Sequence, residues 1–167
     1  MVTPLLFLTV SAFSTPLLEN SSYHQQGNTC FLTVNEERNQ QNIVLLLSLS
    51  ASEEAAVTVF HRQSFQDKSA GLLRQSTTQL DNWYANQDYP VDHRLYKEVD
   101  NMAIYATTLS PPNDNATAFI KEFKARGNKT RLDMDGMNTH LFFVADKAQA
   151  DAFYQCGISV KSLAAIQ

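Results

Sequence analysis

The sequence is short of the residues that several large classes of protein need. Its 167 residues include two cysteines, five glycines and one tryptophan. Two cysteines are too few for a disulfide-dense scaffold or for a zinc site with four thiolate ligands. Neither a P-loop nor a G-x-G-x-x-G motif occurs, so phosphate-binding loops of these two kinds are excluded.

Positive charge is also scarce, and it is scattered. Thirteen Lys and Arg residues stand against 17 Asp and Glu residues, which gives a net charge of −4 without any basic run. Binding to nucleic acid relies on clustered cations, so a nucleic-acid role is disfavoured. Beyond the N-terminal residues, no apolar run approaches the roughly 18 residues of a transmembrane helix. We therefore expect no membrane span in the mature chain.

The first residues carry the pattern of an export signal. Residues 4–13 are nearly all apolar, and small residues stand at the −3 and −1 positions relative to a cut after Ser14. The alternative is a buried N-terminal strand, since about ten apolar residues are too few to span a bilayer. The sequence thus predicts a signal peptide over 1–14, a flexible lead-in over 15–28 and one domain over 29–167. The protein is then periplasmic or secreted.

The two cysteines bear on the same question. Cys30 lies near the start of the predicted mature chain, and Cys156 lies near its end. Two cysteines in an exported protein usually pair, so export predicts a disulfide between them. In a cytosolic protein they would instead be two buried free thiols. Neither cysteine belongs to a C-x-x-C motif, which argues against a thiol-redox role.

The hydrophobic pattern predicts an α+β domain. Extended, β-prone runs are expected at residues 30–34, 43–50, 55–60, 101–109, 131–135 and 139–145. Helices are expected where apolar residues recur with helical spacing, at residues 69–87, 116–127 and 147–156. Asp135-Gly136 predicts a hairpin turn, Asp146 a helix N-cap, and Gly127 and Gly157 two helix ends. About three helices then pack on a largely antiparallel sheet in a single domain.

No pattern in the sequence identifies a catalytic or metal site. The four histidines are far apart, and none has a histidine partner at the spacing of a helical metal motif. We therefore assign no catalytic residue, no metal ligand and no cofactor. The densest polar cluster is Asp92-His93-Arg94. An active site is one interpretation of this cluster, and a solvated loop after Pro90 is the favoured one.

Aromatic residues near this cluster give a candidate binding surface. Trp83, Tyr84 and Tyr89 stand among Asn and Gln residues, a combination that suits contact with proteins or carbohydrates. Trp83 and Tyr84 also complete the apolar stripe of the predicted helix, so packing in the core is the competing interpretation. With Asp92 and His93, these three aromatic residues make up the predicted binding surface.

The second half of the chain resembles the N-terminal domain of the MotY family, periplasmic components of the ring around sodium-driven flagellar motors. The resemblance covers about residues 28–163 and rests on the order ATAFIKEFKARG, RLDMD, THLFFVA and AQADAFYQC. In that family a cysteine near the mature N-terminus pairs with one near the end of the domain. Cys30 and Cys156 match these positions, with Phe153 on the terminal helix. The resemblance implies an envelope binding domain without catalysis.

Two classes of function remain. The first is a small exported protein that binds another protein in the cell envelope, either as an accessory of a motility or secretion machine or as a toxin-neutralising immunity protein. Its acidic balance suits a basic partner. The second is a periplasmic hydrolase with a dispersed site, for which Asp92, His93 and Asp133 or Asp135 are the first candidates. The sequence makes no prediction of the oligomeric state.

Overall fold

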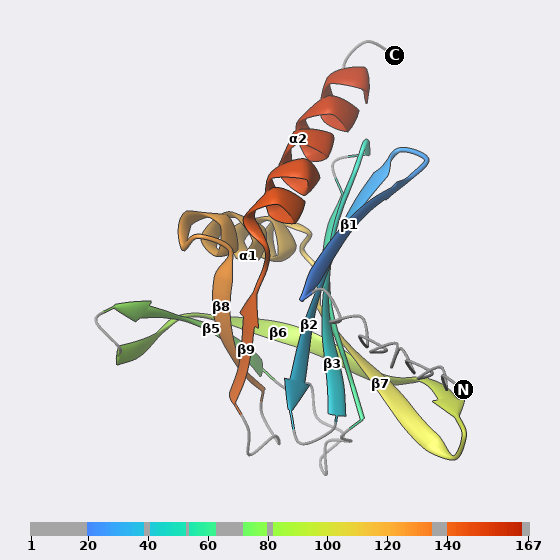
Figure 1. Cartoon of the computed structure of the whole chain (residues 1–167), viewed down its shortest axis with the longest axis vertical. Helices are drawn as coiled ribbons and strands as arrows, with labels where there is room; N and C mark the ends of the chain where they lie inside the picture. The colour runs from blue at the N-terminus through green and yellow to red at the C-terminus, as the bar shows by residue number, and fades with distance from the viewer. Residues whose placement is uncertain are drawn as a thin grey trace, which may run out of the picture.

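The computed structural model describes residues 20–38, 41–52, 54–62, 72–79, 82–134 and 140–164 (Figure 1). In these residues nine strands form one sheet, in the order β1-β2-β3-β4-β7-β6-β5-β8-β9, and all recorded strand pairs are antiparallel. The strands are β1 (Ser21–Gln26), β2 (Thr29–Arg38), β3 (Gln41–Ser50), β4 (Ala55–His61), β5 (Leu72–Gln79), β6 (Asn82–Val99), β7 (Met102–Leu109), β8 (Lys129–Met134) and β9 (His140–Val144). The helices are α1 (Asp114–Ala125) and α2 (Lys147–Ala164). The predicted combination of helices with an antiparallel sheet is confirmed, but the described residues hold two helices and not three.

The predicted helix over 69–87 is wrong, because this stretch contributes β5 and the first part of β6. The side chains of Leu73 and Gln75 are buried and that of Arg74 between them is half-buried, which is the period-two pattern of a strand. β5 pairs with β6 on one side and with β8 on the other. The β-branched pair Thr77-Thr78 favours this extended backbone, and pairing on both sides outweighs the helical spacing of the leucines.

β6 is the long strand that joins the two halves of the sheet. Its first part pairs with β5 as far as Pro90, and from Val91 onward it pairs with β7. The carbonyl of Pro90 accepts a hydrogen bond from the N–H of Ser110 at 2.9 Å. Proline has no N–H to donate, so it fits a strand at the point where the pairing partner changes.

The predicted flexible lead-in over 15–28 contains a strand. Residues 21–26 form β1, which pairs with β2 along its whole length, and Gly27 takes a φ of 56° in the turn between them. The last helix secures this edge strand, since the N–H of Tyr23 donates to Oε1 of Gln149 at 2.8 Å. β1 could not be predicted from its hydrophobic pattern, because its side chains are mostly polar and an exposed edge strand needs few apolar residues.

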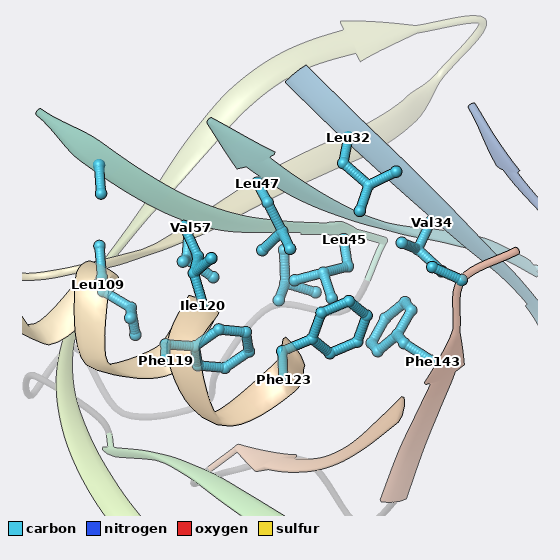
Figure 2. Packing of buried hydrophobic residues seen from close by; sticks show 14 of the residues in the cluster. Leu32, Val34, Leu45, Leu47, Val57, Leu109, Phe119, Ile120, Phe123 and Phe143 are labelled. Carbon is cyan, nitrogen blue, oxygen red and sulfur yellow. The ribbon is translucent and has the colours of Figure 1, made fainter. Parts of the chain in front are cut away.

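The core lies between the sheet and the two helices, and α1 occupies its middle. The sheet bends around this helix, so that β9 at one end of the strand order approaches β2 near the other (Figure 1). The N–H of Phe142 on β9 donates to Oε2 of Glu36 on β2 at 2.8 Å. Figure 2 shows Phe119 and Phe123 of α1 packed against leucines and valines of the strands and against Phe143 of β9.

The helix ends follow two of the three predicted signals. Gly127 follows α1 with a φ of 70°, the left-handed conformation that ends many helices. Oδ1 of Asp146 accepts the N–H groups of Ala148 and Gln149 at 2.9 and 3.2 Å, so Asp146 caps α2 as predicted. The helix does not end at Gly157. A Cβ there would lie 2.6 Å from Cδ1 of Leu49, so glycine lets α2 approach β3 closely.

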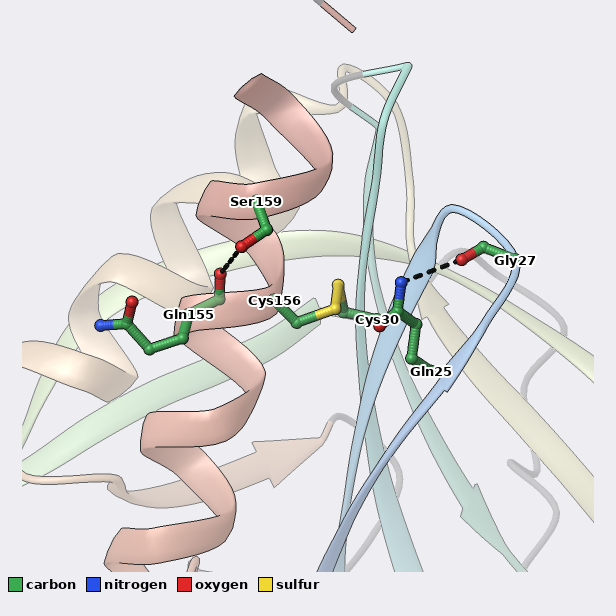
Figure 3. Close-up of a disulfide and its surroundings, with 6 residues drawn as sticks. All are labelled: Gln25, Gly27, Cys30, Gln155, Cys156 and Ser159. Carbon is green, nitrogen blue, oxygen red and sulfur yellow. Dashed lines mark hydrogen bonds between the residues drawn. A yellow bond between two sulfur atoms is a disulfide. The ribbon is translucent and has the colours of Figure 1, made fainter. Parts of the chain in front are cut away.

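The predicted disulfide is confirmed. It joins Cys30 on β2 to Cys156 on α2 and closes a sequence separation of 126 residues (Figure 3). Both cysteines are buried. The bond therefore fixes α2 against the first half of the sheet. Neither helix that the structure describes is both long enough and apolar enough for a membrane crossing.

Candidate functional site

Tyr89 does not belong to a binding surface, because its side chain is fully buried. Its hydroxyl donates to Oε1 of Gln75 at 3.3 Å, and its ring packs on Phe119 with 5.9 Å between the centroids. Burial, with the negative charge of Glu122, raises the pKa of Tyr89 to about 12. Tyr89 faces inward on β6, so its assignment to the surface is wrong.

The other four residues of the predicted surface also lie on β6. The side chains of Trp83 and Tyr84 lie outside the described residues. Asp92 is exposed and His93 is half-buried, because successive residues of a strand point to opposite faces of the sheet. The hydrolase hypothesis requires Asp92 and His93 to meet in one site. Because they point to opposite faces of the sheet, they do not meet there.

His93 is part of a cluster at the base of the β6–β7 hairpin. Its Nδ1 and the Nε2 of the buried His61 lie 2.9 and 2.8 Å from Oγ1 of Thr107. The two imidazoles stack at 5.4 Å, and the ring of Tyr105 stacks on His93 at 5.1 Å. A hydroxyl has one hydrogen to donate and two lone pairs that accept, so Thr107 can donate to one neutral ring and accept from the other. Protonating both rings would break this arrangement and place two positive charges side by side.

We expect this cluster to make the fold less stable in acid. Burial lowers the pKa of His93, so the unfolded chain takes up a proton at a higher pH than the folded chain. The stability that depends on neutral His93 is complete above about pH 6.5, and it is lost as the pH falls through the lowered pKa. Urea unfolding at about pH 7.5 and about pH 5 measures the loss. His93→Gln should reduce it, and the exposed His140→Gln should not. A loss of the same size in all three proteins would contradict the assignment.

The end of the β6–β7 hairpin projects beyond its neighbours. Among the described residues, β4 pairs with β7 no further than Tyr105, and β5 pairs with β6 no further than Pro90. Beyond Tyr105 the hairpin is therefore two-stranded, and we call its projecting end, residues 94–105, the arm. Figure 1 shows the arm in yellow, pointing away from both helices. Asp100 and Asn101 form its turn with φ values of 49° and 62°, as a type I′ turn requires.

Exposed apolar side chains concentrate on the arm. In the part of the chain that the structure describes, the arm holds four of the six exposed large apolar residues, with exposed fractions from 37% to 54%: Leu95, Tyr96, Val99 and Met102. Val99 lies opposite Met102 in the register, and a bulge brings the ring of Tyr96 to 5.1 Å from that of Phe60. Exposed apolar patches of this kind mark contact sites. The arm is therefore the strongest candidate for a binding surface.

A second polar cluster lies on β8 and β9. The carboxylate of Asp133 bonds to the imidazole of His140 and pairs with the guanidinium of Arg131 at 3.0 Å. Asp133, one of the hydrolase candidates, is therefore engaged with His140 and not with His93. The other, Asp135, lies outside the described residues. With the side chain of His140 58% exposed, we interpret the cluster as a surface ion-pair network.

Neither a metal-ligand cluster in the described residues nor a similar known protein points to a function. Within the described ranges, no three His, Cys, Asp or Glu side chains are grouped so that they could hold a metal ion. No protein-family model, no curated protein and no solved structure matches the chain. We therefore infer the function from the disulfide and from the surfaces of this fold.

Proposed function

We propose that this chain is an exported protein of the cell envelope that acts by binding another protein, and that the arm is its main contact surface. The observation that carries the proposal is the concentration of exposed apolar side chains on the arm. Removing such side chains from water is the main favourable term in most protein association. A projecting hairpin can insert them into a partner without any rearrangement of the core.

The composition of the arm suits a protein interface. Its apolar side chains are accompanied by two cations and two anions, all exposed: Arg94, Lys97, Glu98 and Asp100. An apolar centre with a charged rim is the usual anatomy of such interfaces. Tyr96 adds an aromatic ring with a hydroxyl, the kind of residue that is frequent among binding hot spots. The ring of Tyr96 is also accessible, at an exposed fraction of 54%.

The disulfide supports the proposed compartment. Stable disulfides form in the periplasm and outside the cell, and they are rare in the cytosol. The pairing of Cys30 with Cys156 is also the one that the resemblance to the MotY N-terminal domain implies. The predicted signal peptide lies outside the described residues. An accessory of a motility or secretion machine and a toxin-neutralising immunity protein are both forms of this proposal, and the partner's identity separates them.

The test is an affinity purification of the tagged protein from the envelope fraction of its native host. Quantitative mass spectrometry should find one protein partner at a ratio close to that of the tagged chain. A motility or secretion component would identify an accessory, and a toxin would identify an immunity protein. If the tagged chain is abundant and folded but recovers no partner, the proposal is contradicted and a hydrolase assay becomes the next step.

A further inference from the structure

A second surface, separate from the arm, is an apolar groove between α1 and α2. The groove has a cavity of about 270 Å³. Its floor is formed by Leu49 of β3, Ile120 of α1, and Tyr154 and Ile158 of α2. The hydroxyl of Tyr154 donates to Oδ1 of Asn128 at 2.8 Å. Its polar end is thereby satisfied. Ile158 is 57% exposed, which extends the apolar surface beyond the cavity.

Three lysines line the same groove. Lys121 and Lys124 lie on one face of α1, three residues apart, and Lys161 lies on α2. Nζ of Lys124 is 4.6 Å from the centre of the Tyr154 ring, a cation–π contact that holds this charge at the groove. In the part of the chain that is described, none of the three lysines forms an ion pair.

Two acidic residues on these helices, one on each, are engaged with other cations. Glu122 of α1 pairs with Arg126 at 2.8 Å, and Asp151 of α2 pairs with Lys147. The groove therefore carries three ammonium groups without a compensating carboxylate from these pairs. In a chain with a net charge of −4, this is a local reversal of sign. Charge complementarity at such a surface selects an anionic ligand.

We infer that the groove binds an acidic segment of a partner protein, which inserts one apolar side chain between the helices and places carboxylates against the lysines. The cavity of about 270 Å³ lies at the lower edge of the roughly 300–1,000 Å³ that is usual for small-molecule sites. It therefore suits a single anchoring side chain of a larger partner. The inference rests on the proposed function for the existence of a protein partner. The net charge of the whole chain predicts a basic partner. At this contact, by contrast, we expect the partner's segment to be acidic.

The test uses the purified, oxidised protein and a fluorescein-labelled peptide, Glu-Glu-Leu-Glu-Glu, with binding followed by fluorescence anisotropy. We expect saturable binding below about 1 mM. The double variant Lys121→Gln/Lys161→Gln should weaken it by about tenfold or more, because charge-assisted contacts are lost. Lys124 is kept, since it also packs on Tyr154. The matched control Arg62→Gln/Lys129→Gln removes the same charge from two exposed side chains elsewhere on the surface and should stay within about twofold.

Several results would overturn the groove assignment. One is the absence of saturable peptide binding, and another is equal weakening of binding in the two double variants. A third is that a peptide with lysine in place of glutamate, or with serine in place of leucine, binds as tightly as Glu-Glu-Leu-Glu-Glu. Saturable binding of sodium dodecanoate below its micelle concentration, without binding of the peptide, would assign the groove to a lipid instead. Tyr96→Ser should bind the peptide normally. A purification that recovers no partner contradicts the proposed function, whereas a failed peptide titration contradicts only the groove.

Discussion

The double variant Leu95→Ser/Tyr96→Ser is expected to lose its partner while it keeps its fold. Both side chains are about half exposed, at 49% and 54%, so little core packing is removed with them. If they anchor the interface, truncating them should cost about 2 kcal/mol or more of binding free energy, which is about a 30-fold loss of affinity. The measurement is the amount of partner recovered from the envelope fraction, followed by titration with the purified partner.

Val144→Ser is the matched control for this variant. Val144 lies on β9 with an exposed fraction of 50%, almost the same as that of Leu95, but it is not on the arm. The control should recover the partner at the level of the unaltered protein. Circular dichroism and thermal unfolding should show that all three proteins fold alike. Full recovery of the partner by the arm variant, or an equal loss with Val144→Ser, would contradict the role of the arm.

Removing the disulfide is expected to cause the largest loss of stability. Because the bond spans 126 residues of sequence, Cys30→Ser/Cys156→Ser should lower the free energy of unfolding by about 4–5 kcal/mol in the chain-entropy model. Domains of this size are stable by about 5–15 kcal/mol, so a large share of the total would be lost. Urea unfolding of the variant and of the oxidised protein measures the difference directly.

Two controls separate the bond from the chemistry of the replacement. Cys30→Ala/Cys156→Ala avoids burying two hydroxyl groups and should lose nearly as much stability as the serine variant. Reduction of the unaltered protein with dithiothreitol should move its unfolding midpoint toward those of both variants. Unchanged midpoints in all of these would show that the bond does not hold α2 in place. Two alkylatable thiols in protein taken from the native envelope would contradict pairing in the cell.

Much of the sheet can be predicted from the sequence, because inner strands such as β3 and β4 are rich in apolar and β-branched residues. The stretch IVLLLSLS in β3 and the alternating AAVTVF in β4 leave few other structures open. The caps at Asp146 and Gly127 mark helix ends by local chemistry alone. The disulfide could be predicted because an exported chain with two cysteines has one intramolecular pairing.

The missed elements are those whose burial depends on distant partners. In β5, the polar side chain of Gln75 is buried, because it donates to the carbonyl of Phe119 on α1 and accepts from the hydroxyl of Tyr89 on β6. The leucine spacing over 69–87 fits a helix equally well until those partners are known. Gly157 illustrates the same limit, since only the approach of Leu49 explains a glycine inside α2.

The candidate sites were predicted least well. The histidine cluster brings together His61, His93 and Thr107 from three strands, an arrangement that no local spacing can indicate. The arm did leave a signal: Asp100-Asn101 stands between β-prone residues, and both residues tolerate the left-handed backbone of a tight hairpin turn. Pro90 made the arm hard to predict, because a proline usually indicates the end of a helix or strand. In this fold, Pro90 lies instead where β6 changes its pairing partner from β5 to β7.

The most direct test of the central claim is site-specific photo-crosslinking in the native host. A photoreactive amino acid at position 96 places the probe on the arm, and the same residue at position 144 is the control on β9. We expect one discrete, light-dependent adduct at position 96, containing a second envelope protein, and no such adduct at position 144. No adduct at position 96 in folded, exported protein, or the same adducts at both positions, would contradict it.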